Sequence, residues 1–297
     1  MRIGTPFGSV EFGGIECGTG VRTGSSKQVI GWRTLQRDEE NTGVMQTSGV
    51  SRPVSEKWSF DTGGAVYSSA NFVDGTIYVS GNGRLYALNA EDGSKKWEYL
   101  LYKYAAMNVS PTTVDGTVYI GSDNSRFYAL DAEDGSEKWV TSLGGGAGYD
   151  TVVQDGVVYA GRRDVYQGPD PRVFALDTSD GSIIWESDET GEPSGGFAYA
   201  NGMVYAGCED TKIYALDASD GSKVWEFTTG SFVRGAPTVV DDIAYCPSGD
   251  GSVYALDASD GSKLWDFQAG ADIQASPVIV DGTVYVGSFD DKVYAIE

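Results

Sequence analysis

The chain has no histidine, few cysteines and few cations. Histidine is absent from all 297 residues, and it is the usual general base, the usual activator of a nucleophile and the commonest transition-metal ligand. Ser-His-Asp, Cys-His and His-ligated zinc chemistry are therefore excluded. The three cysteines Cys17, Cys208 and Cys246 are far apart in the sequence, so they indicate neither a disulfide framework nor a zinc site.

Long apolar segments are also missing. No run of about 18 apolar residues occurs, so no transmembrane segment is expected. Residues 1–31 lack the apolar core of a signal peptide, and we leave the compartment open. The first 52 residues are rich in Gly, Ser and Thr, which predicts a partly flexible extension over residues 1–52 ahead of a folded domain over residues 53–297.

Acidic residues outnumber basic ones by two to one. The 43 Asp and Glu against 21 Lys and Arg give a net charge of −22 and a pI near 4.2. Nucleic acids and anionic membranes need clustered cations, so partners of those kinds are not expected. Such an excess of acid is typical of proteins that work in high salt, which screens the repulsion. A halophilic source is the favoured interpretation, and an ordinary acidic protein is the alternative.

A repeat dominates the rest of the sequence. One phrase recurs about every 40 residues, which is a period typical of propeller blades: YALNAEDGSKKW (86–97), YALDAEDGSEKW (128–139), FALDTSDGSIIW (174–185), YALDASDGSKVW (214–225), YALDASDGSKLW (254–265) and the unfinished YAIE (294–297). Each phrase follows two apolar alternations around a turn. The turn is Asp-Gly at Asp74, Asp115, Asp155 and Asp281, Asn201-Gly202 in the fourth repeat and Asp241-Asp242 in the fifth.

These signals predict an all-β, six-bladed β-propeller of four-stranded antiparallel blades. A blade needs neighbours on both faces, and an open ring leaves two sheet edges whose unpaired backbone groups can associate with other strands. The segment SEKWSFDTGG (55–64) precedes the first repeat and has no repeat of its own. We therefore expect residues 54–62 to pair into the last blade as its outer strand and close the ring.

The repeats resemble the PQQ-like propeller repeat of the quinoprotein dehydrogenase-like superfamily, which includes outer-membrane assembly lipoproteins. Its pattern of Ala, Gly and Trp matches Ala90, Gly93 and Trp97, and four later repeats keep it with Thr178 as the one departure. The resemblance implies that the tryptophans dock on neighbouring blades and are structural. They are Trp58, Trp97, Trp139, Trp185, Trp225 and Trp265.

One face of such a propeller carries the candidate site. We call the four strands of a blade A to D, from the innermost to the outermost. Aligning the repeats on their turns brings six residues to one level of the channel mouth, on the face with the loops from D to the next A and from B to C: Tyr67, Asn108, Gly148, Ser194, Arg234 and Gln274. Tyr149, Asp150 and Asp272 are neighbours in the sequence. Such a set suits a small-molecule or peptide pocket, and Arg234 suits a carboxylate or phosphate. The alternative is that these residues are simply solvated at the mouth of the channel and bind no ligand.

Residues 162–172 interrupt the third repeat in its B-to-C loop, on the same face. Arg162, Arg163, Tyr166 and Arg172 make this the densest cationic cluster of the chain. It would suit an anionic ligand or a partner loop, and a tolerated surface insertion explains it equally well. On the opposite face the turn aspartates raise calcium binding as a possibility, but turn geometry already explains them, and no metal site is predicted.

We therefore predict a non-catalytic binding platform that holds a protein partner on the face with the D-to-A and B-to-C loops. The candidate partner-binding residues are Tyr67, Asn108, Tyr149, Asp150, Arg162, Arg163, Tyr166, Arg234 and Gln274. No catalytic residue, nucleic acid or cofactor is assigned, the partner is unidentified, and a monomer is expected. The resemblance leaves two alternatives: a dehydrogenase using pyrroloquinoline quinone (PQQ) and calcium, or a small-ligand sensor at the channel mouth. The dehydrogenases it implies are eight-bladed and some carry adjacent cysteines, which this chain lacks. Relatives are often exported.

Overall fold

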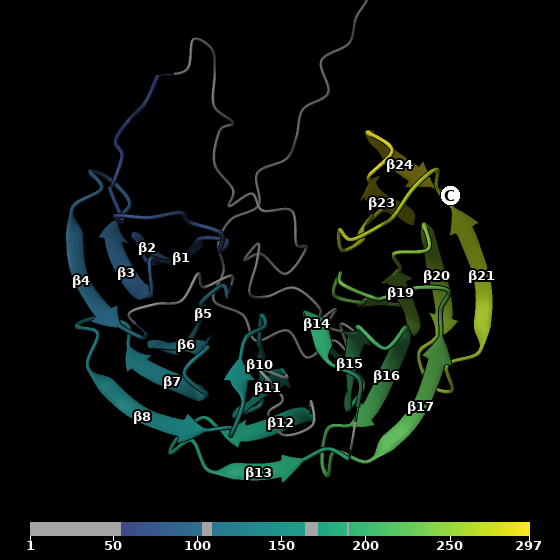
Figure 1. Cartoon of the computed structure of the whole chain (residues 1–297), viewed down its shortest axis with the longest axis horizontal. Helices are drawn as coiled ribbons and strands as arrows, with labels where there is room; N and C mark the ends of the chain where they lie inside the picture. The colour runs from purple at the N-terminus through teal and green to yellow at the C-terminus, as the bar shows by residue number, and fades with distance from the viewer. Residues whose placement is uncertain (1–54, 103–108, 164–171, 189) are drawn as a thin grey trace, which may run out of the picture.

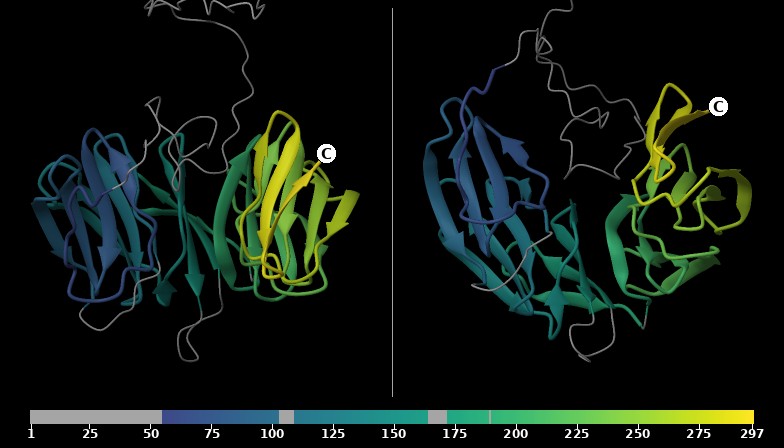
Figure 2. Two further views of the ribbon diagram at one scale, coloured as in Figure 1. Left: turned by 90° about the horizontal axis from the view of Figure 1, so that it is seen from above. Right: turned by 45° about the horizontal axis from the view of Figure 1, so that its top comes forward.

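The computed structural model describes residues 55–102, 109–163, 172–188 and 190–297. These residues form 24 strands and no helix, arranged in six antiparallel sheets that we number 1 to 6 in chain order. The sheets follow one another around an arc, with the innermost strand of each toward the centre (Figure 1). Seen from the edge of the arc, the sheets lie side by side at the same height (Figure 2). The predicted all-β propeller architecture is confirmed: within the described residues four sheets have four strands, sheet 3 has a fifth, and sheet 6 has three.

The strands of the first three sheets run in sequence order from the innermost to the outermost. They are β1 (Asn71–Val73), β2 (Thr76–Gly81), β3 (Arg84–Asn89) and β4 (Lys95–Leu100) in sheet 1; β5 (Thr112–Val114), β6 (Thr117–Ser122), β7 (Arg126–Asp131) and β8 (Glu137–Ser142) in sheet 2; and β10 (Val152–Gln154), β11 (Val157–Arg163), β12 (Arg172–Asp177) and β13 (Ile183–Glu186) in sheet 3, with β9 (Gly146–Ala147) paired to β11.

The remaining sheets keep this order. They contain β14 (Pro193–Ala200), β15 (Met203–Cys208), β16 (Lys212–Asp217) and β17 (Lys223–Thr228) in sheet 4; β18 (Thr238–Val240), β19 (Ile243–Pro247), β20 (Ser252–Asp257) and β21 (Lys263–Gln268) in sheet 5; and β22 (Val278–Val280), β23 (Thr283–Ser288) and β24 (Lys292–Ile296) in sheet 6.

The first hairpin of every sheet turns on two residues with positive φ. Asp74 and Gly75 have φ of 46° and 72°, which is the geometry of the tight turn that matches strand twist. Asp241 and Asp242, the pair without glycine, adopt 49° and 62°. The sequence exception is therefore not a structural exception, because aspartate tolerates the left-handed region better than most residues.

The hydrophobic core lies between consecutive sheets. Five clusters of buried side chains occur, one for each neighbouring pair from sheets 1 and 2 to sheets 5 and 6. In each of the first four, a tryptophan of an outer strand reaches the next sheet. Trp97 donates its indole N–H to the carbonyl oxygen of Ala132 at 3.1 Å, and Trp225 donates to Ala258 at 2.9 Å. The tryptophans therefore join sheets, as the resemblance implied.

The predicted closure of the ring by residues 54–62 is not seen among the described residues. Within the described residues sheet 6 has three strands, and residues 55–62 pair with no strand. Trp58 and Phe60 instead lie against sheet 1: Trp58 donates to the carbonyl of Ala90 at 3.1 Å, and Phe60 packs on Tyr86. Sheet 6 lies at the other end of the arc (Figure 1). The segment is thus held away from β24, and the extension 1–52 lies outside the described residues.

Candidate binding face

Of the residues expected at one level of the channel mouth, Tyr67, Gly148, Arg234 and Gln274 each lie four positions before an innermost strand, Ser194 lies in β14, and Asn108 lies outside the described residues. Hydrogen bonds link this level from one sheet to the next. The backbone N–H of Ser69 donates to the hydroxyl of Ser110 at 3.1 Å, that of Ser110 donates to the Asp150 carboxylate at 2.9 Å, and that of Ala236 donates to the hydroxyl of Ser276 at 2.8 Å. This face is therefore built on a rigid frame.

Asp150 is part of that frame. Its carboxylate takes the place that a serine hydroxyl takes between sheets 1 and 2 and between sheets 5 and 6. A side chain on Gly196 would come within 3.3 Å of the Asp150 Cβ, so the glycine makes room for the longer acid. Burial raises the pKa of the Asp150 carboxyl, and the hydrogen bonds from Ser110 only partly oppose this. The Asp150 carboxyl group is thus engaged in a hydrogen bond that joins sheets 2 and 3.

Changing Asp150 to asparagine tests this role through pH. A carboxyl whose pKa is higher in the folded state contributes stability below the unfolded pKa of about 3.9 and loses it as pH rises through the folded value. We expect Asp150→Asn to gain stability relative to the parent between pH 4 and pH 7, at about 1.4 kcal/mol per unit of pKa shift. Urea unfolding across that range measures it. Asp150→Ala, which removes the acceptor for Ser110, should be less stable than Asp150→Asn throughout. A difference between the parent and Asp150→Asn that does not change with pH would contradict the assignment.

Arg234 is the most accessible cation of this level. Its guanidinium forms two hydrogen bonds with Glu209, at 2.8 and 3.3 Å, and lies 4.2 Å from the centre of the Phe232 ring. The Glu209 contact raises the pKa of Arg234. Its side chain is still 46% exposed, so it is held in one orientation and remains open to a partner.

Tyr149 and Arg163 continue the same polar surface across sheets 3 and 4. The Tyr149 hydroxyl donates to Glu192 at 2.6 Å, and burial together with this contact raises the pKa of the phenol. Arg163 forms an ion pair with Asp123 of sheet 2. Arg163 lies beside the residue before Tyr149, since a Cβ on Gly148 would come within 2.9 Å of the Arg163 Nε.

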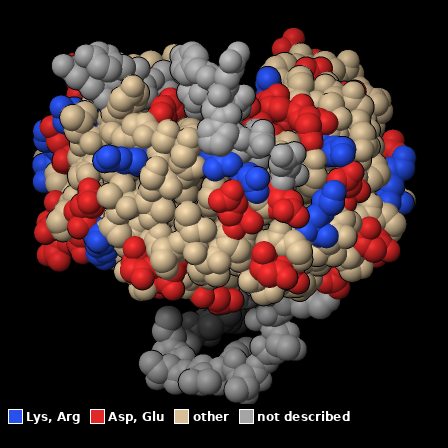
Figure 3. Space-filling view, turned by 60° about the horizontal axis from the view of Figure 1, so that its bottom comes forward, with Lys and Arg blue, Asp and Glu red and all other residues tan. Residues whose placement is uncertain are grey.

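We call this set the polar strip. It consists of Asp123, Tyr149, Arg163, Glu192, Glu209, Phe232 and Arg234. The acids Asp123, Glu192 and Glu209 are absent from the sequence prediction. A signal was available for two of them, since Asp123 and Glu209 each follow the second strand of a repeat directly. On the face shown in Figure 3, acidic side chains are spread widely with basic ones among them.

The predicted cationic cluster forms only in part among the described residues: Arg162 and Arg172 lie opposite each other on β11 and β12 and share the Glu186 carboxylate, at 4.0 and 3.1 Å, whereas Tyr166 lies outside the described residues. Arg162 is only 7% exposed: it donates to the carbonyl of Leu143 at 3.0 Å and lies over the ring of Phe174. Arg172 donates to Ser187 and pairs with Glu186 at 3.1 Å. Neighbouring residues of an extended strand point to opposite faces, so Arg162 turns inward while Arg163 reaches the polar strip. Arg162 is therefore withdrawn from the partner-binding set.

The other predicted residues fall in three groups. Gln274 is half-buried at the predicted level. Tyr67 is 63% exposed and belongs to sheet 1, at the end of the arc. Asn108 and Tyr166 lie outside the described residues. For these four the predicted role in binding stays a prediction.

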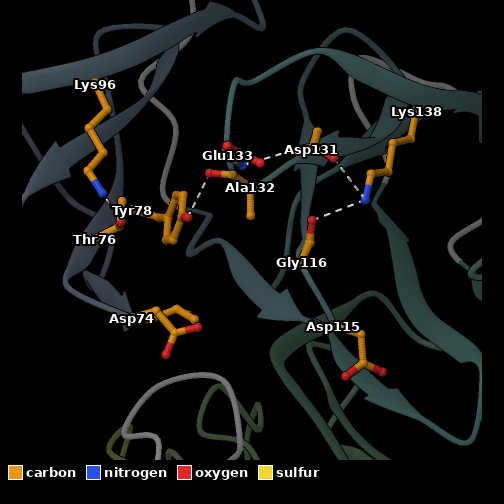
Figure 4. Close-up of a pocket in the computed structure, with 11 residues that line it drawn as sticks. Asp74, Thr76, Tyr78, Lys96, Asp115, Gly116, Asp131, Ala132, Glu133 and Lys138 are labelled. Carbon is orange, nitrogen blue, oxygen red and sulfur yellow. Dashed lines mark hydrogen bonds and ion pairs between the residues drawn. The ribbon is translucent and has the colours of Figure 1, made fainter.

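The opposite face carries a pocket between sheets 1 and 2, with a volume of about 430 Å³ (Figure 4). Two lysines and several acids line it, but the lysines are engaged. Lys96 donates to the Thr76 hydroxyl at 2.6 Å, and Lys138 donates to Thr117 and lies 3.3 Å from Asp131. The turn aspartates of this face cap their own turns, as Asp134 does for Ser136. Among the described residues no group of three acidic, Cys or His side chains is arranged to hold a metal.

The fold and its repeats define the class of protein, a β-propeller of PQQ-like repeats in the quinoprotein dehydrogenase-like superfamily. Within that class the chain belongs to the family described as outer membrane protein assembly factor BamB, whose model matches residues 32–190 and 169–297. A search of curated proteins finds no match. No helix in the described part of the chain is long and apolar enough to cross a membrane.

Solved structures share the fold at low identity. BamB from Moraxella catarrhalis is 19% identical, with a TM-score of 0.55 over 77% of this chain and 84% of that one. The quinohemoprotein alcohol dehydrogenase ADHIIG from Pseudomonas putida HK5 is 19% identical, with a TM-score of 0.62 over 80% of this chain and 48% of that one. The quinohemoprotein alcohol dehydrogenase from Comamonas testosteroni is 16% identical, with a TM-score of 0.68 over 88% and 58%. The chain thus spans about half the length of the two dehydrogenases.

The residues present do not fit a PQQ site of the kind the resemblance implies. The resemblance implies a tryptophan beneath the cofactor in the channel, whereas the described tryptophans belong to outer strands or to the segment before sheet 1. Cys208 and Cys246 are both buried and come from different sheets, β15 and β19. No step through this cofactor is derived, and its absence stays a prediction.

Proposed function

We propose that this chain is a non-catalytic platform that binds a partner protein on the polar strip. The observation that carries the proposal is the fixing of charged side chains from consecutive sheets, above all Arg234 between Glu209 and Phe232. Groups held in place before binding lose little conformational entropy when a partner docks. Membership of a family described by an assembly factor supports a role in protein interaction.

The charge of the strip indicates the chemistry of the partner. Arg163 is paired with Asp123 and Arg234 with Glu209, so Glu192 adds negative charge to a surface whose two arginines are already neutralised. The whole chain carries −22. Complementary charge steers association and selects partners, so the expected partner presents Lys or Arg beside hydrogen-bonding groups.

Photo-cross-linking identifies that partner. A benzoylphenylalanine placed at Gln274, at the level of the strip, is expected to capture it from cells of the source. The same residue placed at Val140, on the outer strand β8 and 36% exposed, is the control and should not. Equal capture at both positions would contradict the assignment of the face.

Binding of the identified partner should then depend on the strip. We expect Glu209→Gln combined with Arg234→Ala to weaken binding at least about tenfold, since central charged contacts of an interface cost about 2 kcal/mol or more when removed. Asp115→Asn, on the opposite face, is the matched control. Calorimetry at two salt concentrations measures the affinity of the double variant and of the control variant for the partner. Unchanged affinity in the double variant would refute the site.

The enzyme alternative has its own measurement. A titration with PQQ and calcium in molar KCl, with tryptophan quenching and dye-linked alcohol oxidation followed together, should give neither signal. Saturable quenching with turnover would overturn the platform and make this chain a small quinoprotein enzyme.

A further inference from the structure

The two ends of the arc carry two halves of one interface. Each of sheets 1 to 5 presents to the next sheet a Tyr on its second strand paired with an Ala on its third, together with an apolar residue two positions before that Ala. The apolar residues are at most 1% exposed: Leu85, Phe127, Val173, Ile213 and Val253. Sheet 6 has the same set, but Tyr285 is 41% exposed and Val293 77%.

Sheet 1 shows the opposite half at the other end. Its residues Ile77 and Val79 are half-buried, whereas the corresponding pairs in the five later sheets, from Val118 and Ile120 to Val284 and Val286, are at most 3% exposed. Only a segment in the position of an outer strand lies here, since Trp58 and Phe60 cover sheet 1 as Trp225 and Phe227 cover sheet 5, although residues 55–62 are paired with no strand. Sheet 1 therefore has against it the segment that would be the fourth strand of a neighbouring sheet, without the other three strands, and within the described residues sheet 6 has three strands and no fourth.

Two side-chain matches fit these halves together. The carbonyl oxygen of Ala132 accepts from Trp97 and from Tyr78, and that of Ala258 accepts from Trp225 and from Tyr205. The equivalent carbonyl of Ala90 accepts from Trp58, and the tyrosine at the matching position is Tyr285.

The second match is at the residue before each tryptophan. Where it is lysine, threonine begins the second strand of the same sheet, and Lys96 and Lys138 donate to Thr76 and Thr117. Where it is apolar, the strand begins with an apolar residue: Ile184 with Val157, Val224 with Met203 and Leu264 with Ile243. Sheet 6 begins its second strand with Thr283, and the residue before Trp58 is Lys57.

We propose that the exposed face of sheet 6 docks on sheet 1 of a second copy of this chain, so that residues 55–62 of one copy become the fourth strand beside β24 of the other. Tyr285 then donates to Ala90 and Lys57 to Thr283 across the contact. Pairing within one chain would have to bring together sheets that lie at opposite ends of the arc (Figure 1). That movement would change the angle at five close-packed interfaces, which resist deformation. Pairing between copies leaves all five unchanged, and linkage gives no advantage when geometry forbids contact within one chain.

A cross-link between copies tests the proposal. Lys57→Cys is made in one copy and Thr283→Cys in a tagged second copy, both with Cys17→Ser, because Cys17 lies outside the described residues while Cys208 and Cys246 are buried. The two are mixed and treated with a short bis-maleimide. We expect a heterodimer that neither variant forms alone. Thr76→Cys with Lys96→Cys in a single chain is the positive control, since those side chains touch.

Two outcomes would overturn the proposal. One is a cross-link within one chain when both substitutions are in the same diluted copy, which would mean that the arc closes on itself. The other is no cross-link between Lys57→Cys and Thr283→Cys, either between copies or within one copy, while the control pair reacts. Association is also measured by light scattering over a range of concentrations. Val293→Glu should weaken it about tenfold or more, whereas Leu264→Glu, at a 50% exposed position on β21, should leave it unchanged; equal effects would count against the contact.

Discussion

Replacing Trp225 by alanine is expected to lower the free energy of unfolding by about 3–5 kcal/mol, the range for removing a buried aromatic side chain. Trp225 is 7% exposed, donates its indole N–H to Ala258 and lies against Gly261 of the next sheet. The change therefore opens a cavity between sheets 4 and 5 and leaves the Ala258 carbonyl with one donor fewer. Urea unfolding followed by circular dichroism measures the loss, since the substitution itself alters tryptophan fluorescence.

The same substitution at Trp265 is the control, and the structure separates two positions that the repeat makes equivalent. Trp265 is half-exposed. The turn that covers Trp225 comes after β20 of the next sheet, and no such turn follows β24 within the described residues. We expect Trp265→Ala to cost about 1–2 kcal/mol, in proportion to the smaller apolar area that it buries. Equal losses at the two positions would show that docking on the next sheet contributes little.

The fold was predictable because the same sequence signals for strands and turns recur in six copies of the repeat. An Asp-Gly turn, a Tyr-Ala pair and a Gly before the Trp each satisfy a local requirement: positive φ, close packing or a flat surface for the indole. Agreement among the copies averages out the ambiguity of any single one. Closure was not predictable in this way, because it depends on the angle between sheets summed around the arc, and no single repeat encodes that sum.

The binding face was predictable in outline only. The alignment put Arg234 and Gly148, the neighbour of Tyr149, at matching positions, and both lie four residues before an innermost strand, because position along the strand follows from the turn. It missed that Asp150 bonds to Ser110, which depends on the gap left by Gly196 in the next sheet. It also counted Arg162 as accessible, although strand alternation directs it beneath the loop that contains Leu143. Contacts between sheets decide both cases, and a single repeat does not contain them.

Gly135→Ala is expected to destabilise the protein by about 2–5 kcal/mol. Gly135 has a φ of +74°, which costs an alanine about 1–2 kcal/mol. A Cβ there would also lie 2.7 Å from the ring carbons of Trp97, and forcing extra volume into a packed contact adds about 1–3 kcal/mol. Unfolding in urea gives the total effect.

Gly116→Ala separates the two contributions. Gly116 has a φ of +68°, but a Cβ there meets nothing within 4 Å, so only the backbone cost of about 1–2 kcal/mol is expected. The difference between the two variants then reports the contact with Trp97 alone. Repeating both changes in a Trp97→Ala background should remove that difference, because residues in contact couple and distant ones do not. A difference that persists without the indole would mean that Gly135 serves its turn and has no part in joining sheet 1 to sheet 2.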